Sequence, residues 1–500
     1  MKAYSALKEK LATVVDLRNA ASVLGWDQQT YMPPGGAQAR SDQLATLEKL
    51  AHEHFTAPEV GDLLARAAEE VARFDQDSDE RSLVRVVRRD YNKALKVPST
   101  LVAEIARTSS MAMESWVRAR AESSFPLFQP DLEKVFHLQR ELARCLGFEE
   151  CIYDALLDQY EPGAKASELR RVFGELKEGL VPLVQAISER LSRVDDSVLH
   201  RSYAEARQWE FGVEILKRFG YDLSRGRQDK SVHPFTTSFS RHDVRITTRV
   251  DERFFPTALF GTLHECGHAL YEQGVSESLE RTLLAGAASL GVHESQSRLW
   301  ENLVGRSRPF WRFFYPRLQS LFPDCLGNVP LEDFYRAINR VEPSLIRVEA
   351  DEITYNLHVL LRFELEIAVL EEVISVADLP AAWNARMESY LGVVPRNDSE
   401  GVLQDVHWSN GLVGYFPTYS LGNVISVQLF EKAQSDSPEI RSQMDEGRFT
   451  ALLEWLRKHI HVYGRKRLPH ELLQRATGET LQVGPYLNYL RSKYSEIYSL

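Results

Sequence analysis

The chain contains 500 residues, of which 44% are hydrophobic and 26% are charged, a composition typical of a globular protein with a substantial core. Its 60 Lys and Arg residues are outnumbered by 71 Asp and Glu residues, so the formal net charge is -11 and binding to nucleic acid or anionic lipid is disfavoured. The same composition excludes collagen, intrinsic disorder and a small disulfide-stapled scaffold.

Cysteine usage and the N-terminal sequence indicate the compartment. The four cysteines, Cys145, Cys151, Cys266 and Cys325, show no paired CxxC spacing and are too few for a disulfide framework in so long a chain. Charged residues interrupt every apolar run behind Met1, and no later stretch reaches membrane-spanning length. We therefore expect a cytoplasmic protein that is neither exported nor anchored in a membrane.

The first 220 residues have the periodicity of helices. Apolar residues from Leu7 to Leu24 lie three or four positions apart, which predicts an amphipathic helix that ends near Gly25. A loop is expected at 32–36, where the sequence reads MPPGG. Long stretches rich in Leu, Ala, Glu and Arg then continue to about Phe219, so the N-terminal half is predicted to be helical.

One segment has a different pattern. From Ser231 to Val250 the chain is rich in Thr, Val, Ile and Phe around a polar centre at 240–243, which predicts a small antiparallel β-hairpin. Helical patterns resume at Pro256 and continue to Val373. The stretch 394–423, rich in Gly, Asn and aromatic residues, is expected to be ordered but irregular, and the tail from 426 is predicted to be helical.

No internal repeat, low-complexity block or Pro/Ser-rich linker divides the chain. We therefore predict one domain over 1–500, with an N-terminal helical part (about 1–220), a metal-site part (about 221–425) and a C-terminal helical part (about 426–500). The predicted fold class is mainly α with one small sheet.

The residues most informative about chemistry lie at 264–268, which read HECGH within a helical pattern that ends at Gly274. An α-helix turns by about 100° per residue, so His264 and His268 project from nearly the same side, one turn apart, and can bind one zinc ion. Glu265 lies beside them, where its carboxylate can accept a proton from a water on the metal and deliver it to a leaving amine. Cys266 points about 200° away from His264 and is expected to be a packed core thiol.

A chance match is the alternative, because HExxH should arise on the order of 0.03 times per sequence with this many histidines. The helical spacing of Phe260, Leu263 and Leu270 around the motif argues against that alternative. An open zinc site also needs a third protein ligand. Glu294 begins another helical pattern 26 residues after His268 and could return to the metal, although its spacing fits equally well a surface carboxylate that complements a helix dipole.

Further blocks accompany these residues in a recognisable order, and together they resemble the carboxypeptidase Taq family of zinc metallocarboxypeptidases. The matching blocks are WDQQTYMPPGG at 26–36, HPF at 233–235, DVRIT at 243–247, HECGH at 264–268, HESQ at 293–296, IRVEAD at 346–351, GVLQDVHW at 401–408 and GYFPTYSLGN at 414–423. The resemblance implies a mostly helical, neurolysin-like fold with a deep groove and the small sheet beside the active site, and it usually implies a homodimer. It also implies Glu294 as the third ligand, zinc or cobalt as the metal, and removal of single residues from the free C-terminus of peptides with broad preference.

Such a reaction needs a cation that holds the terminal carboxylate of the substrate, and the planar fork of Arg suits it. Arg347 in the IRVEAD block is our first choice, against the alternative of a helix-surface ion pair with Glu349 or Asp351. Arg245 in DVRIT could compete for this role, or could hold the hairpin against the helix that carries the HExxH motif. His233 of the HPF block is a further candidate for contact with the substrate.

The same reaction also needs donors for the tetrahedral intermediate and a way to align the peptide. His407 and Tyr419 are our candidates for the donors, and Tyr415 lies in the same stretch, with ordinary packing as the alternative for each. The edge of the predicted hairpin could align an extended peptide through main-chain hydrogen bonds, or it could be an ordinary capped edge.

The sequence departs from one pattern common in zinc peptidases of this type. Arg298 occupies the position four residues after Glu294, where many of them have an Asp that accepts a hydrogen bond from a zinc-binding His. Glu301, seven residues after Glu294 and so on the same helical face, is a candidate substitute, as is Asp351.

Two other functions compete with the carboxypeptidase. A zinc endo-oligopeptidase on the same fold would use the same HExxH motif and Glu ligand. A peptide-binding scaffold with a closed structural metal would not need Glu265, because a structural site has no open position.

Overall fold

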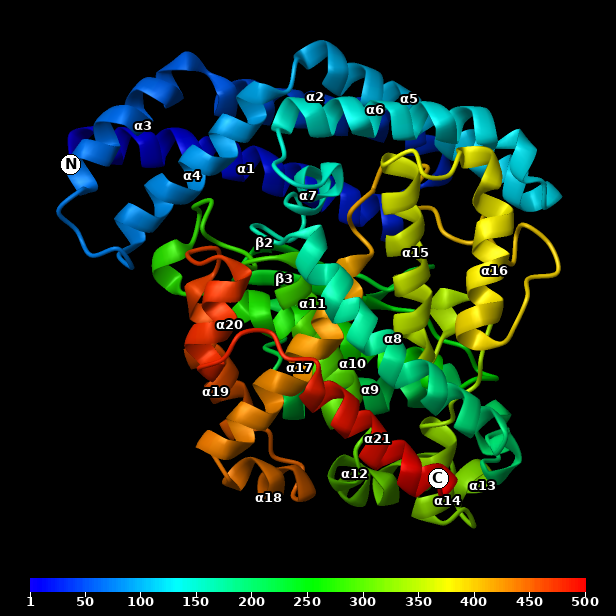
Figure 1. Ribbon diagram of the computed structural model, residues 1–500. Coiled ribbons are helices and arrows are strands. Elements are labelled where there is room, and N and C mark those ends of the chain that lie inside the picture. Colours follow the sequence, from blue (N-terminus) through cyan, green and yellow to red (C-terminus); the bar gives the residue numbers. More distant parts are fainter. The chain divides into compact units, whose positions relative to one another are not determined.

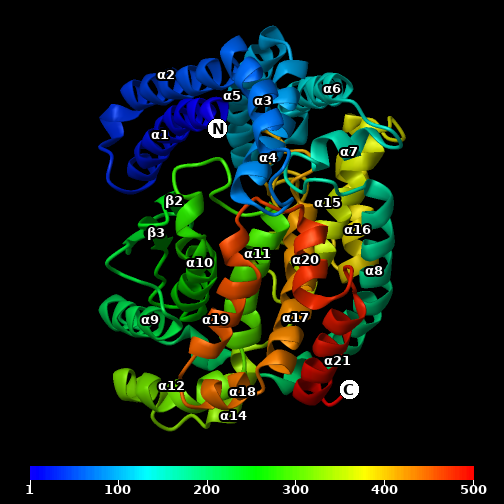
Figure 2. The same cartoon turned by 90° about the vertical axis from the view of Figure 1, so that its left-hand side faces the viewer.

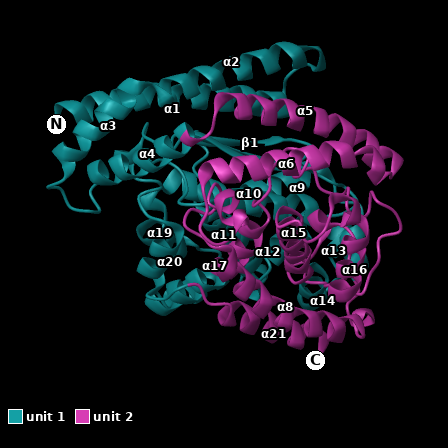
Figure 3. Ribbon diagram, turned by 45° about the horizontal axis from the view of Figure 1, so that its top comes forward, with its two compact units in different colours: residues 1–95, 196–338, 426–480 teal, residues 96–195, 339–425, 481–500 magenta.

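The structure is a computed structural model that describes all residues from Met1 to Leu500, and it is mainly helical, with 69% helix and one three-stranded sheet (Figure 1). The predicted fold class is therefore confirmed at this level. No helix combines the length and the apolar character needed to cross a bilayer. The chain forms two compact units, and each unit is built from three separate stretches (Figure 3): residues 1–95, 196–338 and 426–480 form unit 1, and residues 96–195, 339–425 and 481–500 form unit 2.

Unit 1 contains the N-terminal helices, the sheet and the helices around the HExxH motif. Its helices are α1 (Lys2–Thr30), α2 (Ala37–Thr56), α3 (Pro58–Val71), α4 (Asp79–Lys96), α9 (Glu205–Phe219), α10 (Pro256–Gly274), α11 (Leu290–Arg298), α12 (Arg308–Leu321), α13 (Pro323–Leu326), α14 (Leu331–Ile338), α18 (Glu439–Asp445), α19 (Thr450–His459) and α20 (Pro469–Thr477). Unit 2 contains α5 (Ser99–Glu122), α6 (Gln129–Leu146), α7 (Ile152–Leu157), α8 (Ala166–Ser188), α15 (Thr354–Leu370), α16 (Leu379–Leu391) and α21 (Gly484–Tyr498). Helix α17 (Pro417–Asp436) begins in unit 2 and ends in unit 1.

The sheet has the order β1-β3-β2, with β1 (Gly226–Lys230), β2 (Thr236–Ser240) and β3 (Asp243–Thr248). Strands β2 and β3 pair antiparallel around a turn at 241–242, so the hairpin predicted from the sequence is confirmed. Strand β1, which pairs parallel with β3, was not predicted. Its sequence, GRQDK, has no alternating apolar residues and only Asp229 is buried, so it lacks the usual signal of a half-buried strand.

Helix α10 lies against this sheet and packs on β2, β3, α9 and α11 (Figure 2). It begins with Pro256 in its first turn, where the missing N–H of proline costs no helical hydrogen bond. Its close approach to α11 requires Gly267: a Cβ at this position would lie 2.5 Å from the carbonyl oxygen of Gln296 and 2.6 Å from Cα of Ser297. The HExxH helix and the helix of the HESQ block are therefore held backbone to backbone.

Two predicted boundaries are wrong. Helix α1 continues through Gly25 to Thr30, because a single glycine costs a helix only about 1 kcal/mol and Trp26 in the next turn is buried. The stretch 394–423 is irregular only as far as Phe416, since α17 begins at Pro417.

Unit 2 is organised around α15, which is buried on nearly all sides and packs against α6, α7, α8 and α16. A helix that is buried all round is usually apolar, yet α15 carries His358, Arg362 and Glu366 at intervals of four residues, and each is fully buried. Buried charges need partners, and those partners bring together the residues described below.

Candidate metal centre

Helix α10 and helix α11 bring His264, His268 and Glu294 together in unit 1. Their candidate ligand atoms lie within 4.8 Å of one another. Oε2 of Glu294 lies 3.6 Å from Nε2 of His264 and 3.4 Å from Nε2 of His268, so the three atoms face a common point. Two imidazole nitrogens and one carboxylate oxygen form the donor set of an open catalytic site, and this arrangement fits a divalent metal.

Glu301 orients His264. Nδ1 of His264 lies 2.9 Å from Oε2 of Glu301, which leaves Nε2 directed towards Glu294. Such a carboxylate partner selects the tautomer of a metal-binding histidine and raises its basicity. The sequence suggested two carboxylates, Glu301 and Asp351, as hydrogen-bond acceptors for a metal-binding histidine. The structure brings Glu301 to His264. Asp351 instead lies in unit 2, where it accepts hydrogen bonds from Thr354 at the start of α15.

Glu301 lies on a turn of π-helix (Leu299–Val304) that directly follows α11. The wider turn continues the helical path while changing which side chains share a face, and π-turns of this kind occur mostly at functional sites. In this chain the turn places Glu301 behind His264.

Arg298 joins the two carboxylates behind the histidines. Its Nε donates to Oε1 of Glu294 at 2.7 Å, and its Nη1 donates to Oε2 of Glu301 at 3.2 Å. Burial alone would raise the pKa of both carboxyl groups, but Arg298 and the histidines outweigh burial and lower the pKa of Glu294 far below its usual range and that of Glu301 to about 2. The residue that breaks the expected sequence pattern therefore keeps both carboxylates ionised.

His268 is stacked on His293, with ring centroids 4.3 Å apart and an interplanar angle of 19°. His293 is itself held by Glu272, whose Oε1 lies 2.9 Å from Nε2 of His293. Burial and the neighbouring His293 lower the pKa of His268 to about 3, so its ring is neutral at physiological pH, as a metal ligand must be.

Glu265 is buried on the side of α10 that faces the sheet. The hydroxyl of Thr236 in β2 lies 2.7 Å from its Oε2 and 2.9 Å from its main-chain oxygen. Burial raises the pKa of Glu265, against opposing contributions from His264 and Thr236. A carboxylate with a raised pKa beside a metal site is suited to accepting a proton near neutral pH.

The other candidates of unit 1 lie in different surroundings. Cys266 is fully buried, in agreement with its expected place in the core, and burial raises the pKa of its thiol. His233 is exposed on the loop between β1 and β2. The guanidinium of Arg245 makes two hydrogen bonds of 2.8 Å to Asp243 and lies over the rings of Trp26, at 4.4 Å, and Phe239, at 4.9 Å.

Unit 2 holds Arg347 in a buried cluster rather than on a helix surface. Its Nη2 lies 2.7 Å from Oδ1 of Asp405, and its Nη1 donates to the hydroxyl of Tyr355 at 2.7 Å. Arg362 of α15 binds the other oxygen of Asp405, with Nε 2.6 Å from Oδ2. Two guanidinium groups therefore share one carboxylate, and the cluster carries an excess positive charge.

His407 and Tyr419 lie together beside this cluster. Nε2 of His407 is 3.1 Å from the hydroxyl of Tyr419, and Nδ1 of His407 is 3.8 Å from Oδ1 of Asp405. Burial lowers the pKa of His407 to about 4, despite the nearby Asp405, so the imidazole is neutral at pH 7 and can donate only one hydrogen bond at a time.

Several residues that contact the candidates were not identified from the sequence, namely Thr236, Arg362 and Asp405. Asp405 lies within the GVLQDVHW block and Thr236 directly follows the HPF block. These positions lie within or beside the blocks but did not indicate what either residue does. Arg362 had no sequence signal beyond a charge inside a strongly apolar helix, and such a charge indicates a buried partner.

Comparison with known proteins gives matches along the whole chain. Residues 6–494 match the carboxypeptidase Taq (M32) metallopeptidase family. The chain is 44% identical to thermostable carboxypeptidase 1 of Thermus thermophilus, over 99% of each chain, and 40% identical to carboxypeptidase 1 of Bacillus subtilis, over 96% of each.

Solved structures agree with these sequence matches. The crystal structure of an M32 carboxypeptidase from Deinococcus radiodurans R1 matches with a TM-score of 0.97, at 40% identity and over 100% of both chains. The likeness therefore extends over both units and includes the segments that carry the metal-centre candidates.

Proposed function

This chain belongs to the carboxypeptidase Taq (M32) metallopeptidase family and is a metallocarboxypeptidase, and from that premise we propose that it removes single residues from the free C-terminus of peptides with broad specificity. The observation that carries the proposal is the convergence of His264, His268 and Glu294 beside the buried carboxylate of Glu265. We propose Zn²⁺ as the metal, with Co²⁺ as an alternative that the same ligands accept.

We propose that His264, His268 and Glu294 hold the metal while Glu265 handles the protons. Bound there, zinc would act as a Lewis acid and would lower the pKa of a nearby water to about 7. Glu265 accepts a proton from the attacking water and delivers it to the leaving amine, and the Thr236 hydroxyl fixes its carboxylate for both steps. Glu301 keeps His264 in the tautomer that binds through Nε2.

We propose Arg347, rather than Arg245, as the group that binds the terminal carboxylate of the substrate. Arg347 and Arg362 both pair with the single carboxylate of Asp405, so these three side chains carry one net positive charge. A carboxylate can satisfy that charge through charge-assisted hydrogen bonds. Arg245 is already paired with both oxygens of Asp243, which favours a role in tying the sheet to α1.

We propose His407 and Tyr419 as donors to the oxyanion of the tetrahedral intermediate. In their mutual hydrogen bond of 3.1 Å, the Nε2–H of His407 can donate to the Tyr419 oxygen, which leaves the Tyr419 hydroxyl proton available to the oxyanion. We propose further that His233 contacts the substrate from its exposed loop and that the edge of the sheet aligns the extended peptide.

The remaining parts of the proposal concern the whole molecule. We propose a single catalytic domain with a deep, neurolysin-like groove, a cytoplasmic location and a homodimeric state. The resemblance to the family and the sequence patterns support these proposals, and size-exclusion chromatography with light scattering tests the dimer.

A mass-spectrometric time course on a peptide of about ten residues, run beside its C-terminal amide, tests the activity. The free acid should give a ladder of single-residue losses, and the amide should give none, since the amide lacks the carboxylate that Arg347 would bind. Internal fragments from both peptides would reject the exopeptidase and establish the endo-oligopeptidase instead.

A further inference from the structure

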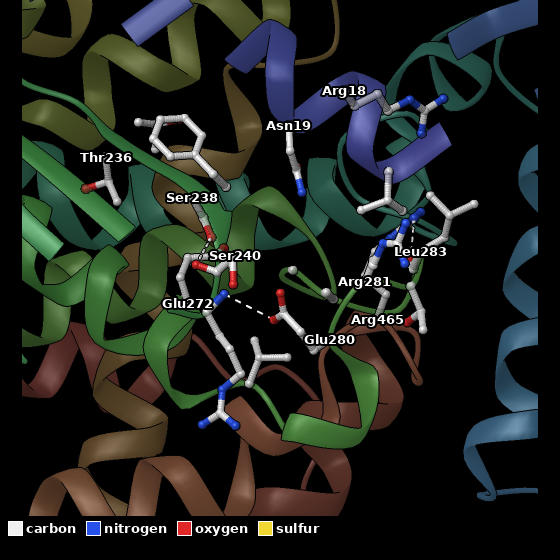
Figure 4. A pocket seen from close by; sticks show the side chains of 18 residues that line it. Arg18, Asn19, Thr236, Ser238, Ser240, Glu272, Glu280, Arg281, Leu283 and Arg465 are labelled. Atoms are coloured by element: carbon white, nitrogen blue, oxygen red, sulfur yellow. Dashed lines mark hydrogen bonds between the residues drawn. The ribbon is translucent and has the colours of Figure 1, made fainter. Parts of the chain in front are cut away.

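A cavity of about 420 Å³ in unit 1 lies between α1 and β2 and adjoins the metal centre (Figure 4). Its lining includes Thr236, whose hydroxyl contacts Glu265, and Glu272, which holds His293 on His268. Its size suits a few residues of a peptide.

One wall of the cavity is a strand edge with main-chain groups available for pairing. Thr247 N donates to the carbonyl of Phe235, and Val244 N donates away from β2 to the carbonyl of Arg225, each at 2.9 Å. Hydrogen-bonding pairs alternate along an antiparallel ladder, so Thr237 faces β3, whereas the N–H and C=O groups of Thr236 and Ser238 point to the open edge. An extended peptide can pair with that edge.

Most of the positive charge around the cavity is neutralised by acids outside its lining. Three of its four lining arginines form ion pairs: Arg241 with Glu277, Arg281 with Asp16, and Arg465 with Asp90. Arg18 is the fourth; it is exposed, and Figure 4 shows it extending away from Ser238 and Glu280.

The centre of the cavity is acidic and able to accept hydrogen bonds. Glu280 forms no ion pair with Arg or Lys and accepts one hydrogen bond, from the main-chain N–H of Arg241 at 3.2 Å. The Asn19 side chain has no hydrogen-bond partner, and Figure 4 shows it directed from α1 towards Glu280, Ser238 and Ser240. The carboxylate of Glu280, the amide oxygen of Asn19 and the hydroxyl oxygens of Ser238 and Ser240 thus line the same cavity.

We propose that this cavity is a substrate subsite for a basic side chain that precedes the scissile bond, with its ammonium or guanidinium bound by Glu280 and Asn19. This proposal rests on the exopeptidase activity proposed above. Only one substrate residue lies beyond the bond that such an enzyme cuts, so a cavity that extends along β2 from Thr236 is reached by the residues on the N-terminal side. Lysine fits because its three donors match the three kinds of acceptor.

The strand geometry gives the position of that basic residue. At about 3.3 Å per residue, Ser240 lies about 13 Å along the strand from Thr236. If the residue that precedes the scissile bond, the second from the C-terminus, lies opposite Thr236, the residues opposite Ser238 and Ser240 are the fourth and sixth from the C-terminus. A basic residue elsewhere in the peptide should have little effect.

The test uses N-acetylated peptides of nine residues with a constant C-terminal residue, in which lysine, norleucine or glutamate is moved through the sequence. Acetylation removes the competing N-terminal amine. We expect kcat/KM for the first cleavage to be about tenfold higher for lysine than for norleucine at the fourth to sixth positions from the C-terminus, and lower for glutamate. The lysine preference should weaken with added salt.

Two variants assign the preference to the cavity. Glu280→Gln should abolish the preference for lysine while keeping activity on the norleucine peptide, because glutamine retains the acceptor for the main chain of Arg241. The matched control is Glu53→Gln, an exposed acid of α2 that pairs with Lys49 and does not line the cavity, and it should keep the preference. Asn19→Asp, which adds a second negative charge to the lining, should increase the preference a few-fold and provides an independent test if Glu280→Gln does not fold.

The outcomes separate this inference from the proposed function. Equal rates for the lysine and norleucine peptides at every position, or a preference that both Glu280→Gln and Asn19→Asp leave unchanged, would overturn the subsite. Absence of single-residue loss from every free-acid peptide would instead overturn the carboxypeptidase.

Discussion

Removal of the carboxylate behind His264 should weaken metal binding without removing a ligand. In Glu301→Ala the 2.9 Å hydrogen bond to Nδ1 of His264 is lost, and both partners are largely buried, so water replaces the carboxylate poorly. Partners of this kind typically contribute 10- to 100-fold in metal affinity, which corresponds to about 1.4 to 2.8 kcal/mol. Glu301→Gln keeps an acceptor but loses the charge, so its loss should lie near the lower end of that range.

In the assay, metal-free protein is titrated with Zn²⁺ in the presence of a competing chelator of known affinity. The return of peptidase activity reports the fraction of protein that has bound the metal. Asp351→Asn is the control. Asp351 was the other carboxylate that the sequence suggested as a partner for a metal-binding histidine, but in the structure it accepts a hydrogen bond from Thr354. Its metal affinity should equal that of the unmodified protein. If Glu301→Ala binds Zn²⁺ within twofold of the unmodified protein, or if Asp351→Asn shows the larger loss, the orienting role of Glu301 is refuted.

Three further predictions follow from the geometry. Glu265→Gln should lower kcat by 10²- to 10⁴-fold while Zn²⁺ binding, measured by the same titration, is retained, and unchanged turnover would exclude Glu265 as the base. Gly267→Ala should lower the free energy of unfolding in urea by about 1 to 3 kcal/mol, because the new Cβ would meet the main chain of α11 at 2.5 Å. Gly174→Ala, inside α8 with no atom within 4 Å of the new Cβ, should be neutral or stabilising. Burial raises the pKa of Glu366 to about 7, so its neutral form is favoured in the folded state and the stability that it contributes is lost as the pH rises from about 4.5 through 7. Glu366→Gln should remove a pH dependence of up to about 3 kcal/mol between pH 5 and 8 in urea unfolding, and identical pH profiles for the two proteins would contradict this assignment.

Much of the fold could be predicted from the sequence because helices and hairpins leave local patterns. The 3.6-residue periodicity identified the helical character of the chain, and the alternation and polar turn at 231–250 predicted the pairing of β2 with β3. Strand β1 and the extension of α1 beyond Gly25 escaped prediction, since both depend on neighbours distant in the sequence. A parallel partner and a buried Trp26 override weak local preferences.

For the candidate site, the sequence by itself determined which residues on one helix share a face. The HExxH spacing places His264 and His268 side by side in any α-helix, and the family blocks pointed to Glu294. Only the tertiary structure decided which distant side chains pair with the site residues. His264 pairs with Glu301 rather than Asp351, and Arg347 pairs with Asp405 rather than with a surface acid. Buried charges must find partners in three dimensions, and sequence separation does not encode which partners come within reach.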